Sequence, residues 1–425
     1  MKPLHLLAAL FCLSLLRALA GEAPPASAGA KGSVVLYVKE TAGLRRFGYP
    51  ASGRVQLPRS AVKDAEHCRL VNDKETAVPA QFTIAGRHQD GSVEWLDVDF
   101  STSPLPWQTQ TFFLDYGPDV KPAPARGLTL TETDAAYQVG GYVVPKSGDL
   151  ALGGIRYGSK VFVEEGRGFT LGVHTKDNRY LTMKDAQISA RRIEKAGPVN
   201  VTIVTEGKYE QLTDAQPITF VTRLEWVNSK SWVRLSHKVS DPLRRVTELE
   251  LMAPFALQAP LNFDFGVGSW LYGQLAADER VRFTQTATSG TVETPTRVNW
   301  KAVTIKGQNE VPFAASNPNE PRQHAEGWAH VGDAKSVIAV GFDQFNERFG
   351  ERVMEFYGDG SAFFHYKPTP DLRPRSPNFL GRAQKVEHEL AVYFHFVGVP
   401  VNKTALTSPP SMLAPLQVTW KAGRK

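Results

Sequence analysis

Hydrophobic and polar residues alternate with a period of two along much of the chain, which is typical of β-strands with one buried face. From Ser33 onward, Val34, Leu36 and Val38 share one face of a predicted strand. A second clear case is ITFVTRLEWV at 218–227, where apolar side chains on one face oppose charged side chains on the other. This alternation favours antiparallel sheets that have one face in contact with water.

The same pattern predicts a series of strands and very little helix. After the strand that begins at Ser33, the first third of the chain contains three more, at Gln81–Ile84, Val93–Phe100 and Thr109–Tyr116. The longer remainder contains strands at Val161–Val163, Val199–Tyr209, Ile218–Val227, Trp232–Val239, Thr247–Met252, Val337–Phe342, Val353–Phe356, Ala362–Tyr366 and His388–Val397. One short helix is expected at Phe345–Glu351, where phenylalanines recur at helical spacing.

Turn and linker signals divide the chain into two folded parts. The Pro-rich segment KPAPARG at 121–127 separates residues 33–118, expected to form a small β-barrel, from residues 128–420, expected to form a large antiparallel β-sandwich. Residues 1–20 resemble a secretory signal peptide, and residues 21–32 resemble a flexible linker. The sequence thus predicts a secreted or periplasmic all-β protein. No later stretch reaches eighteen apolar residues, so no membrane span is expected.

Composition supports the all-β prediction. The 425 residues include 23 Phe, 12 Tyr and 8 Trp, but only 5 Met and 2 Cys. Aromatic residues are enriched in strands. Cleavage of the predicted signal peptide removes Cys12 and leaves Cys68 as the one cysteine, so an internal disulfide is excluded. Stability is therefore expected to come from a large hydrophobic core.

The charge balance narrows the class of partner only slightly. The formal net charge is +6, and removal of Lys2 and Arg17 with the signal peptide would leave 6 − 2 = +4. This weak excess is compatible with an acidic polysaccharide as the partner, but it also suits a solvated surface without any partner. The chain has no run of five basic residues, which counts against nucleic acid as a partner.

Established catalytic and cofactor motifs are missing from the sequence. It contains no nucleophile elbow, phosphate loop, dinucleotide fingerprint or HExxH pair. We therefore expect no cofactor, and the spacing of the histidines predicts no metal site. Candidate functional residues have to be sought in looser clusters.

The first cluster is DGSVEWL at 90–96, followed by two further acids at Asp97 and Asp99. Asp90-Gly91 suits a tight hairpin turn. Trp95 shares a face with the two acids, so its ring could stack on a sugar while the carboxylates bind hydroxyl groups. The alternative is that Trp95 covers a sheet edge or faces the neighbouring domain, because tryptophan is usually largely buried.

The second cluster consists of histidines and nearby aromatic residues. Trp328 and His330 lie in HAEGWAH at 324–330, His365-Tyr366 lies in a later strand, and His388 begins the last long strand. Imidazole titrates near neutral pH and could act as a general base. However, His388 and His237 have the same parity as apolar neighbours, and histidines in that position are more often satisfied core residues.

The third cluster is FDQFNERFGER at 342–352. Arg348 and Arg352 are four residues apart and could clamp a carboxylate of the ligand. Alternatively, Glu347 and Glu351 neutralise these arginines on the surface of a short helix.

Three motifs near the N-terminus carry a family resemblance. They are FGYP at 47–50, AVPAQ at 77–81 and DGSVEWL at 90–96. Their spacing resembles the N-terminal barrel of the exo-rhamnogalacturonan lyase-like family. Downstream, Gly327-Trp328, Asp333, the strand 337–342 and the segments 388–390 and 393–395 look like the central β-sandwich of that family. The resemblance covers roughly residues 33–420.

The resemblance also implies features in which this sequence differs. The family usually has a large C-terminal helical toroid after the sandwich, and this chain ends at Lys425. Gly350-Glu351 and Val386-Glu387 stand where the resemblance implies Pro-Lys and Lys-Thr. These differences at positions directed toward an acidic substrate favour binding over catalysis.

Three functions are consistent with the sequence. The preferred one is binding of a polysaccharide, with a pectic polymer as one option, through Trp95, Trp328, Arg348 and Arg352. The second is a polysaccharide lyase that acts by β-elimination, for which His330, His365, Tyr366, His388, Lys385 and Arg348 supply suitable acids, bases and cations. The third is a structural protein that docks a separate helical partner through an apolar surface.

Overall fold

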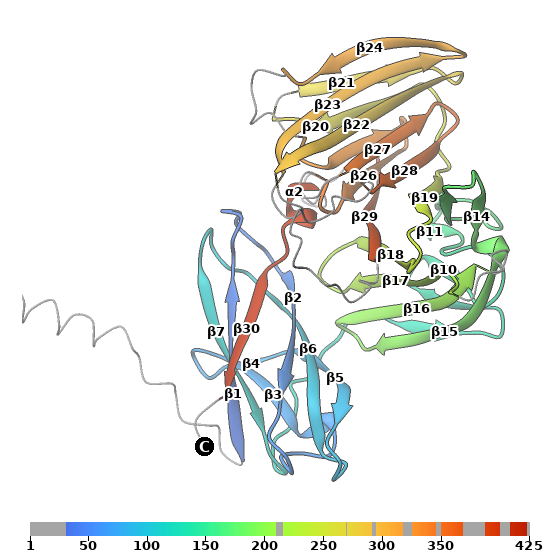
Figure 1. The fold of residues 1–425 in the computed structure, drawn as a ribbon. Coiled ribbons are helices and arrows are strands. Elements are labelled where there is room, and N and C mark those ends of the chain that lie inside the picture. The colour runs from blue at the N-terminus through green and yellow to red at the C-terminus, as the bar shows by residue number, and fades with distance from the viewer. Residues whose placement is uncertain are drawn as a thin grey trace, which may run out of the picture.

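The computed structural model describes residues 31–209, 216–268, 270–290, 295–317, 325–345, 350–368, 387–399 and 409–422, and these residues form mainly antiparallel strands (Figure 1). This confirms the all-β fold class. The described helical segments are short: η1 (Ala65–His67), η2 (Met183–Asp185) and α2 (Pro409–Leu413). None of the described helices has the length and apolarity that a membrane span requires. The predicted signal peptide and nearly all of the predicted linker lie outside the described residues.

The N-terminal unit consists of two sheets around a shared core. The first sheet has the strand order β30 (Gln417–Ala422), β1 (Gly32–Lys39), β7 (Thr109–Tyr116), β3 (Cys68–Asn72) and β4 (Ala77–Val78). The second has the order β2 (Tyr49–Gln56), β6 (Val93–Thr102) and β5 (Ala80–Arg87). As the alternation predicts, Val34, Leu36 and Val38 are buried in the core between them. Cys68 is a free thiol in the same core, and burial raises its pKa to about 12.

The last strand of the chain belongs to this N-terminal unit, not to the sandwich. β30 pairs antiparallel with β1 from Val34↔Ala422 to Lys39↔Gln417, and Figure 1 shows the red strand beside the blue one. The prediction that residues 128–420 form one sandwich domain is therefore wrong at its C-terminal end. Alternation identifies a strand, but it carries no information about which distant strand will be its neighbour.

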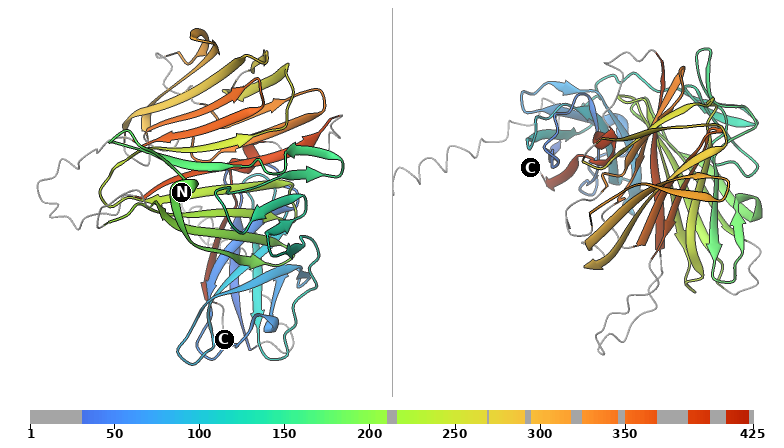
Figure 2. Two further views of the ribbon diagram at one scale, coloured as in Figure 1. Left: turned by 90° about the vertical axis from the view of Figure 1, so that its right-hand side faces the viewer. Right: turned by 90° about the horizontal axis from the view of Figure 1, so that it is seen from above.

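The sandwich unit contains two large sheets packed face to face (Figures 1 and 2). The eight-stranded sheet has the order β14 (Tyr180–Thr182), β13 (Thr170–Thr175), β19 (Val246–Pro254), β28 (Ser361–Lys367), β27 (Gly350–Tyr357), β22 (Glu279–Gly290), β23 (Pro295–Lys306) and β24 (Asn309–Ala315). The nine-stranded sheet has the order β15 (Ala186–Ala196), β16 (Asn200–Tyr209), β17 (Thr219–Val227), β18 (Trp232–Ser240), β29 (Glu387–Gly398), β26 (Ser336–Phe342), β25 (Trp328–Gly332), β20 (Leu261–Gly266) and β21 (Trp270–Leu275). A further sheet has the order β12 (Lys160–Val163), β11 (Ile155–Tyr157), β10 (Tyr142–Pro145), β9 (Ala136–Val139) and β8 (Leu130–Glu132).

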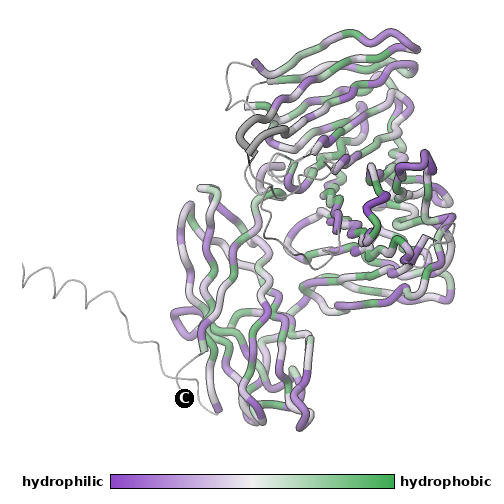
Figure 3. The backbone as a smooth tube through the Cα atoms, viewed as in Figure 1, coloured by the Kyte–Doolittle hydropathy of each residue, from purple (hydrophilic) through white to green (hydrophobic). Residues whose placement is uncertain are grey.

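The core of the sandwich is rich in aromatic residues, as the composition suggests. Phe283, Phe356, Phe364 and Phe394 are fully buried between the two large sheets. Hydrophilic and hydrophobic residues alternate along many of the strands (Figure 3). The hydrophobic ones supply the buried core. The strands predicted for this unit are all present. The helix predicted at Phe345–Glu351 is wrong for its last two residues, because β27 begins at Gly350.

The two units are joined by buried polar contacts. The side chain of Gln81 accepts hydrogen bonds from the backbone N–H groups of Val199 (3.0 Å) and Asn200 (2.8 Å), and it donates to the carbonyl of Asn200 (3.0 Å). Asp99 lies 2.7 Å from the ammonium group of Lys195 and accepts from the Asn200 amide. Because these groups are satisfied by one another, the units are held in a defined relative position.

Candidate functional site

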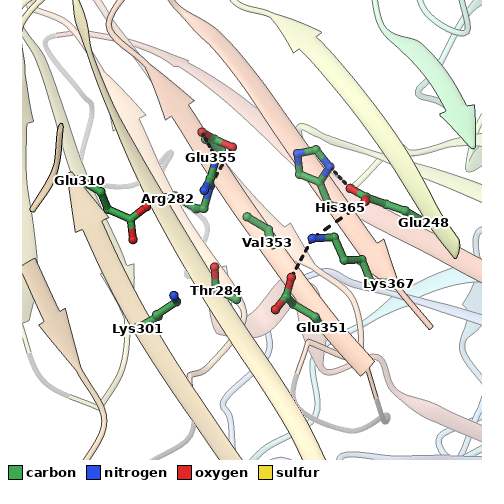
Figure 4. Close-up of a pocket in the computed structure, with 10 residues that line it drawn as sticks. All are labelled: Glu248, Arg282, Thr284, Lys301, Glu310, Glu351, Val353, Glu355, His365 and Lys367. Carbon is green, nitrogen blue, oxygen red and sulfur yellow. Dashed lines mark hydrogen bonds and ion pairs between the residues drawn. The ribbon is translucent and has the colours of Figure 1, made fainter. Parts of the chain in front are cut away.

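An open, strongly polar hollow lies on the outer face of the eight-stranded sheet. We call it the trough (Figure 4). Its volume is about 320 Å³. Ten residues from β19, β28, β27, β22, β23 and β24 line it: Glu248, Arg282, Thr284, Lys301, Glu310, Glu351, Val353, Glu355, His365 and Lys367. All but Val353 carry a polar or charged group, as expected for the outer face of an antiparallel sheet whose other face forms the main core.

Strand alternation explains how this polar surface arises. In β28, Phe364 and Tyr366 point into the sandwich core. The residues that alternate with them, His365 and Lys367, point to the trough. Pairing of His365 with Val353 on β27 aligns the outward residues of neighbouring strands. Side chains far apart in the sequence are thereby brought onto one surface.

Ion pairs fix the orientation of most of the charged side chains in the trough. His365 Nδ1 lies 2.6 Å from Glu248 Oε1, and Lys367 Nζ lies 2.9 Å from Glu351 Oε1 (Figure 4). The Arg282 guanidinium contacts Glu355 through two nitrogens at 3.3 Å. Such pairs hold donors and acceptors in place without leaving an isolated buried charge.

A second group of polar residues lies on β13, β14 and β19, beside the trough in the same sheet. Tyr180 donates to Glu250 Oε1 at 2.6 Å, and its ring stacks on His174 with a centroid distance of 4.5 Å. Gly172 permits this arrangement, because a Cβ atom there would approach Tyr180 Cε2 to 2.6 Å. One ligand atom each from His174, Glu248 and Glu250 lies within 4.8 Å of the others, so these three residues could hold a metal ion.

The electrostatic environment keeps Glu248 ionised. Its partial burial alone would raise the pKa, but the hydrogen bond from His365 and the nearby cationic side chains outweigh that effect and lower the pKa below its usual value. Ionised Glu248 accepts a hydrogen bond from the Nδ1–H group of His365, and in this tautomer of the neutral imidazole Nε2 carries the lone pair. The pair can therefore accept a proton or a hydrogen bond from a ligand.

The structure separates the histidines and tyrosine predicted as lyase residues. His365 lies in the trough, whereas Tyr366 points into the sandwich interior. There Tyr366 meets two other predicted residues. The guanidinium of Arg352 lies 4.5 Å from the centroid of its ring, and His388 lies edge-on at 6.4 Å. Arg352 is buried, so the predicted exposed arginine clamp is wrong at this position, and Arg348 and Lys385 lie outside the described residues.

Trp328 and His330 lie on the outer face of the other large sheet. His330 Nδ1 lies 2.7 Å from Asp264 Oδ1, and the Trp328 indole N–H donates to Glu326 at 2.6 Å. The centroids of the Trp328 and His330 rings are 5.4 Å apart. This pair of residues does not line the trough, so the predicted binding and catalytic residues do not form one site.

Trp95 is half-buried on β6 and packs against Gly86. The neighbouring carboxylates of Asp97 and Asp99 contact other side chains of the protein. Asp97 pairs with Arg54 at 2.7 Å, and Asp99 faces the sandwich unit. Among the described residues, the most exposed aromatic ones are Tyr272 (69%), Trp107 (66%) and Phe47 (65%), and Trp107 and Tyr272 were not among the residues predicted to bind a ligand. The period-two pattern could not identify Trp107 and Tyr272, because an exposed ring contributes no periodic signal.

A second hollow, of about 350 Å³, lies between the two units and is lined by Tyr49, Trp232, Arg234 and Tyr393 among others. The charge of Arg234 is already balanced there by three carboxylates: Glu225 (2.8 Å), Glu389 (3.3 Å) and Asp343 (3.5 Å). Cations are paired with carboxylates in both hollows, and we regard the trough as the better candidate site because it contains the wider range of polar groups.

Solved structures of other proteins have a fold similar to that of this chain. The chain is similar to an alpha-mannosidase from Enterococcus faecalis V583, with a TM-score of 0.54, 12% identity and coverage of 99% of this chain. It is also similar to a protein in glycosyl hydrolase family 38 from Enterococcus faecalis, with a TM-score of 0.53, 11% identity and coverage of 97%. The chain spans about half the length of these proteins, covering 49% and 50% of them.

Other comparisons do not identify a family. A galactose mutarotase-like protein from Lactobacillus casei matches 64% of the chain and 100% of its own length at a TM-score of only 0.32. No protein-family model matches the chain. No curated protein matches it either.

Proposed function

We propose that this protein binds a carbohydrate polymer along the trough. The observation that carries the proposal is the open polar surface across neighbouring strands of one sheet, in which acids, cations and a histidine are fixed by mutual contacts. Sugars present many hydroxyl groups, which need donors and acceptors held in fixed positions. An open face, unlike an enclosed pocket, also leaves room for a chain to continue on both sides.

Two further observations support a carbohydrate ligand. Two solved structures that share the fold are named as an alpha-mannosidase and as a protein in a glycosyl hydrolase family. The sequence motifs resemble the exo-rhamnogalacturonan lyase-like family, which selects an acidic pectic polymer as the first ligand to test. The cations Arg282, Lys301 and Lys367 are the trough residues that would meet its carboxylates. A signal peptide, if present as predicted, would place the protein outside the cytoplasm where such polymers occur.

Replacing both Arg282 and Lys301 by alanine is expected to weaken binding to rhamnogalacturonan by tenfold or more, because two charge-assisted contacts are lost. Isothermal titration at low and high salt, with a neutral glucan for comparison, measures this effect. Part of the wild-type affinity should disappear at high salt, because exposed charges are screened.

Lys306→Ala is the matched control. Lys306 lies on the same strand, β23, but pairs with Asp278 at 3.1 Å outside the trough, so its loss should leave the affinity unchanged. Trp328→Ala tests the alternative site predicted from the sequence. Binding that survives the double substitution but is lost with Trp328→Ala would move the site to the other sheet, and no binding to any polymer would reject the proposal.

A polysaccharide lyase is the second candidate function, and the His365–Glu248 pair favours it. β-Elimination requires a base that removes the C5 proton next to a uronate carboxylate and a cation that stabilises the developing charge. It also requires an acid that protonates the glycosidic oxygen as its bond to C4 breaks and the C4–C5 double bond forms, and the base, once protonated, can supply that proton. Nε2 of His365 is available as the base when Nδ1 donates to Glu248, and Lys367 supplies a cation in the same trough.

The lyase proposal predicts ultraviolet absorbance from the unsaturated uronate product when the protein is incubated with rhamnogalacturonan. His365→Ala should reduce this signal by at least 100-fold while leaving binding of the polymer within a few-fold. His330→Ala on the other sheet should retain full activity. Wild-type protein that binds the polymer without any increase in absorbance would exclude the lyase and leave binding as the function.

A further inference from the structure

Three potential metal ligands from β13 and β19 meet beside the trough: His174, Glu248 and Glu250. His174 Nε2 lies 3.5 Å from Glu250 Oε2. This distance exceeds the usual length of about 2.7–3.2 Å for a nitrogen–oxygen hydrogen bond. Ligand atoms held about 2.0–2.2 Å from a tetrahedral zinc ion, in contrast, lie roughly 3.3–3.6 Å from one another. The spacing fits two ligands of one metal ion, and His365 Nδ1 lies at the same distance, 3.5 Å, from Glu250 Oε2.

A third ligand is present at the same point. Glu248 on β19 lies two residues before Glu250, so both carboxylates project from the same face of the strand. His174 on the adjacent strand pairs in register with Glu248. One ligand atom from each of the three residues falls within 4.8 Å of the other two. One imidazole and two carboxylates balance the charge of a divalent cation.

The residues around these three groups hold them in the orientation that a metal site needs. Tyr180 donates to Glu250 Oε1 at 2.6 Å, which leaves Oε2 directed toward His174. The Tyr180 ring also stacks on the imidazole of His174. On the other side, His365 contacts Glu248 Oε1 at 2.6 Å. Hydrogen-bonded partners that orient the ligands are a general feature of protein metal sites.

We propose that His174, Glu248 and Glu250 bind one divalent transition-metal ion of the zinc class, with Tyr180 and His365 as positioning residues. His174 keeps 38% of its side-chain surface accessible, so the site is open on one side. An open coordination position could take water or a ligand oxygen. This proposal goes beyond the proposed function and holds whether or not the trough binds a polysaccharide.

The test uses the full mature chain without an affinity tag, stripped of metal with a chelator and titrated calorimetrically with zinc chloride. We expect one zinc ion per chain. His174→Ala and Glu250→Gln should each weaken zinc binding by at least 100-fold, and Tyr180→Phe by about 10–100-fold. Circular dichroism and thermal unfolding of each variant check that it is folded.

His330→Ala is the matched control, because His330 contacts Asp264 on the other sheet and is not part of the three-residue group. It should bind zinc like the wild type. Calcium and magnesium should bind more weakly than zinc, because they prefer oxygen ligands over the imidazole nitrogen. Absence of zinc binding, equal binding by the His174→Ala variant, or preference for calcium would each overturn the proposal.

Discussion

Acidification from pH 7 to pH 4 is expected to lower the free energy of unfolding of this protein by about 3 kcal/mol through His237 alone. His237 lies fully buried on β18, and burial lowers its pKa to about 3. Thr222 Oγ1 contacts its Nδ1 at 2.9 Å, and the Tyr209 hydroxyl is 3.4 Å from its Nε2. The folded protein therefore holds this imidazole in its neutral form.

The sign of the effect follows from the two states of His237. In the unfolded chain its pKa is near 6.5, so below that pH the unfolded chain takes up a proton that the folded protein does not accept. The associated stability is complete above about pH 6.5 and is lost as the pH falls toward 3. Burial of His395, whose pKa is lowered to about 4, acts in the same direction.

Urea unfolding followed by tryptophan fluorescence at a series of pH values measures this effect. His237→Gln keeps an amide in place of the ring but cannot titrate, so its stability should depend less on pH between 6.5 and 4. His67→Gln is the control, because the side chain of His67 is 41% exposed. The stability of this variant should depend on pH as that of the wild type does. A His237→Gln variant with the wild-type pH profile would show that this residue is not the source.

Replacing Glu40 by alanine is expected to destabilise the protein by about 3–5 kcal/mol, because it leaves the buried Arg46 without its counter-ion. The side chains of Glu40 and Arg46 are 0% and 1% exposed, and their closest atoms are 2.9 Å apart. Glu40 also accepts backbone hydrogen bonds from Gly43 (2.7 Å) and Trp107 (3.2 Å). Burial alone would raise the pKa of Glu40, but hydrogen bonds from the backbone N–H groups of Trp107 and Ala42 and from the Arg46 side chain outweigh this effect and lower it.

The same pair connects distant parts of the chain. Arg46 donates to the carbonyls of Ser411 (3.1 Å) and Ala414 (2.7 Å), next to the segment that leads into β30.

Arg54→Ala is the matched control, because Arg54 forms an exposed pair with Asp97. Its loss should cost about 0–1 kcal/mol. Equal effects of the two substitutions in urea unfolding would contradict the role assigned to the Glu40–Arg46 pair.

The sequence determined the class of fold and the inward-facing residues of most strands. Period-two alternation was sufficient for Val34, Leu36 and Val38, and for His237, which its parity placed correctly in the core. The strands β22 and β23 were not predicted, although buried Val281 and Phe283 alternate with the outward-facing Arg282 and Thr284 on β22. Those strands carry Arg282, Thr284 and Lys301, so much of the trough was missed with them.

The candidate site itself was decided by tertiary structure. His365 and Tyr366 are neighbours in the sequence, but successive strand residues point to opposite faces, so one lies in the trough and the other in the core. His174 reaches Glu248 because β13 pairs with β19 across more than seventy intervening residues. Likewise, β30 returns to β1 from the opposite end of the chain. Alternation specifies which face a side chain takes, whereas the strand order that brings distant faces together depends on packing of the whole chain.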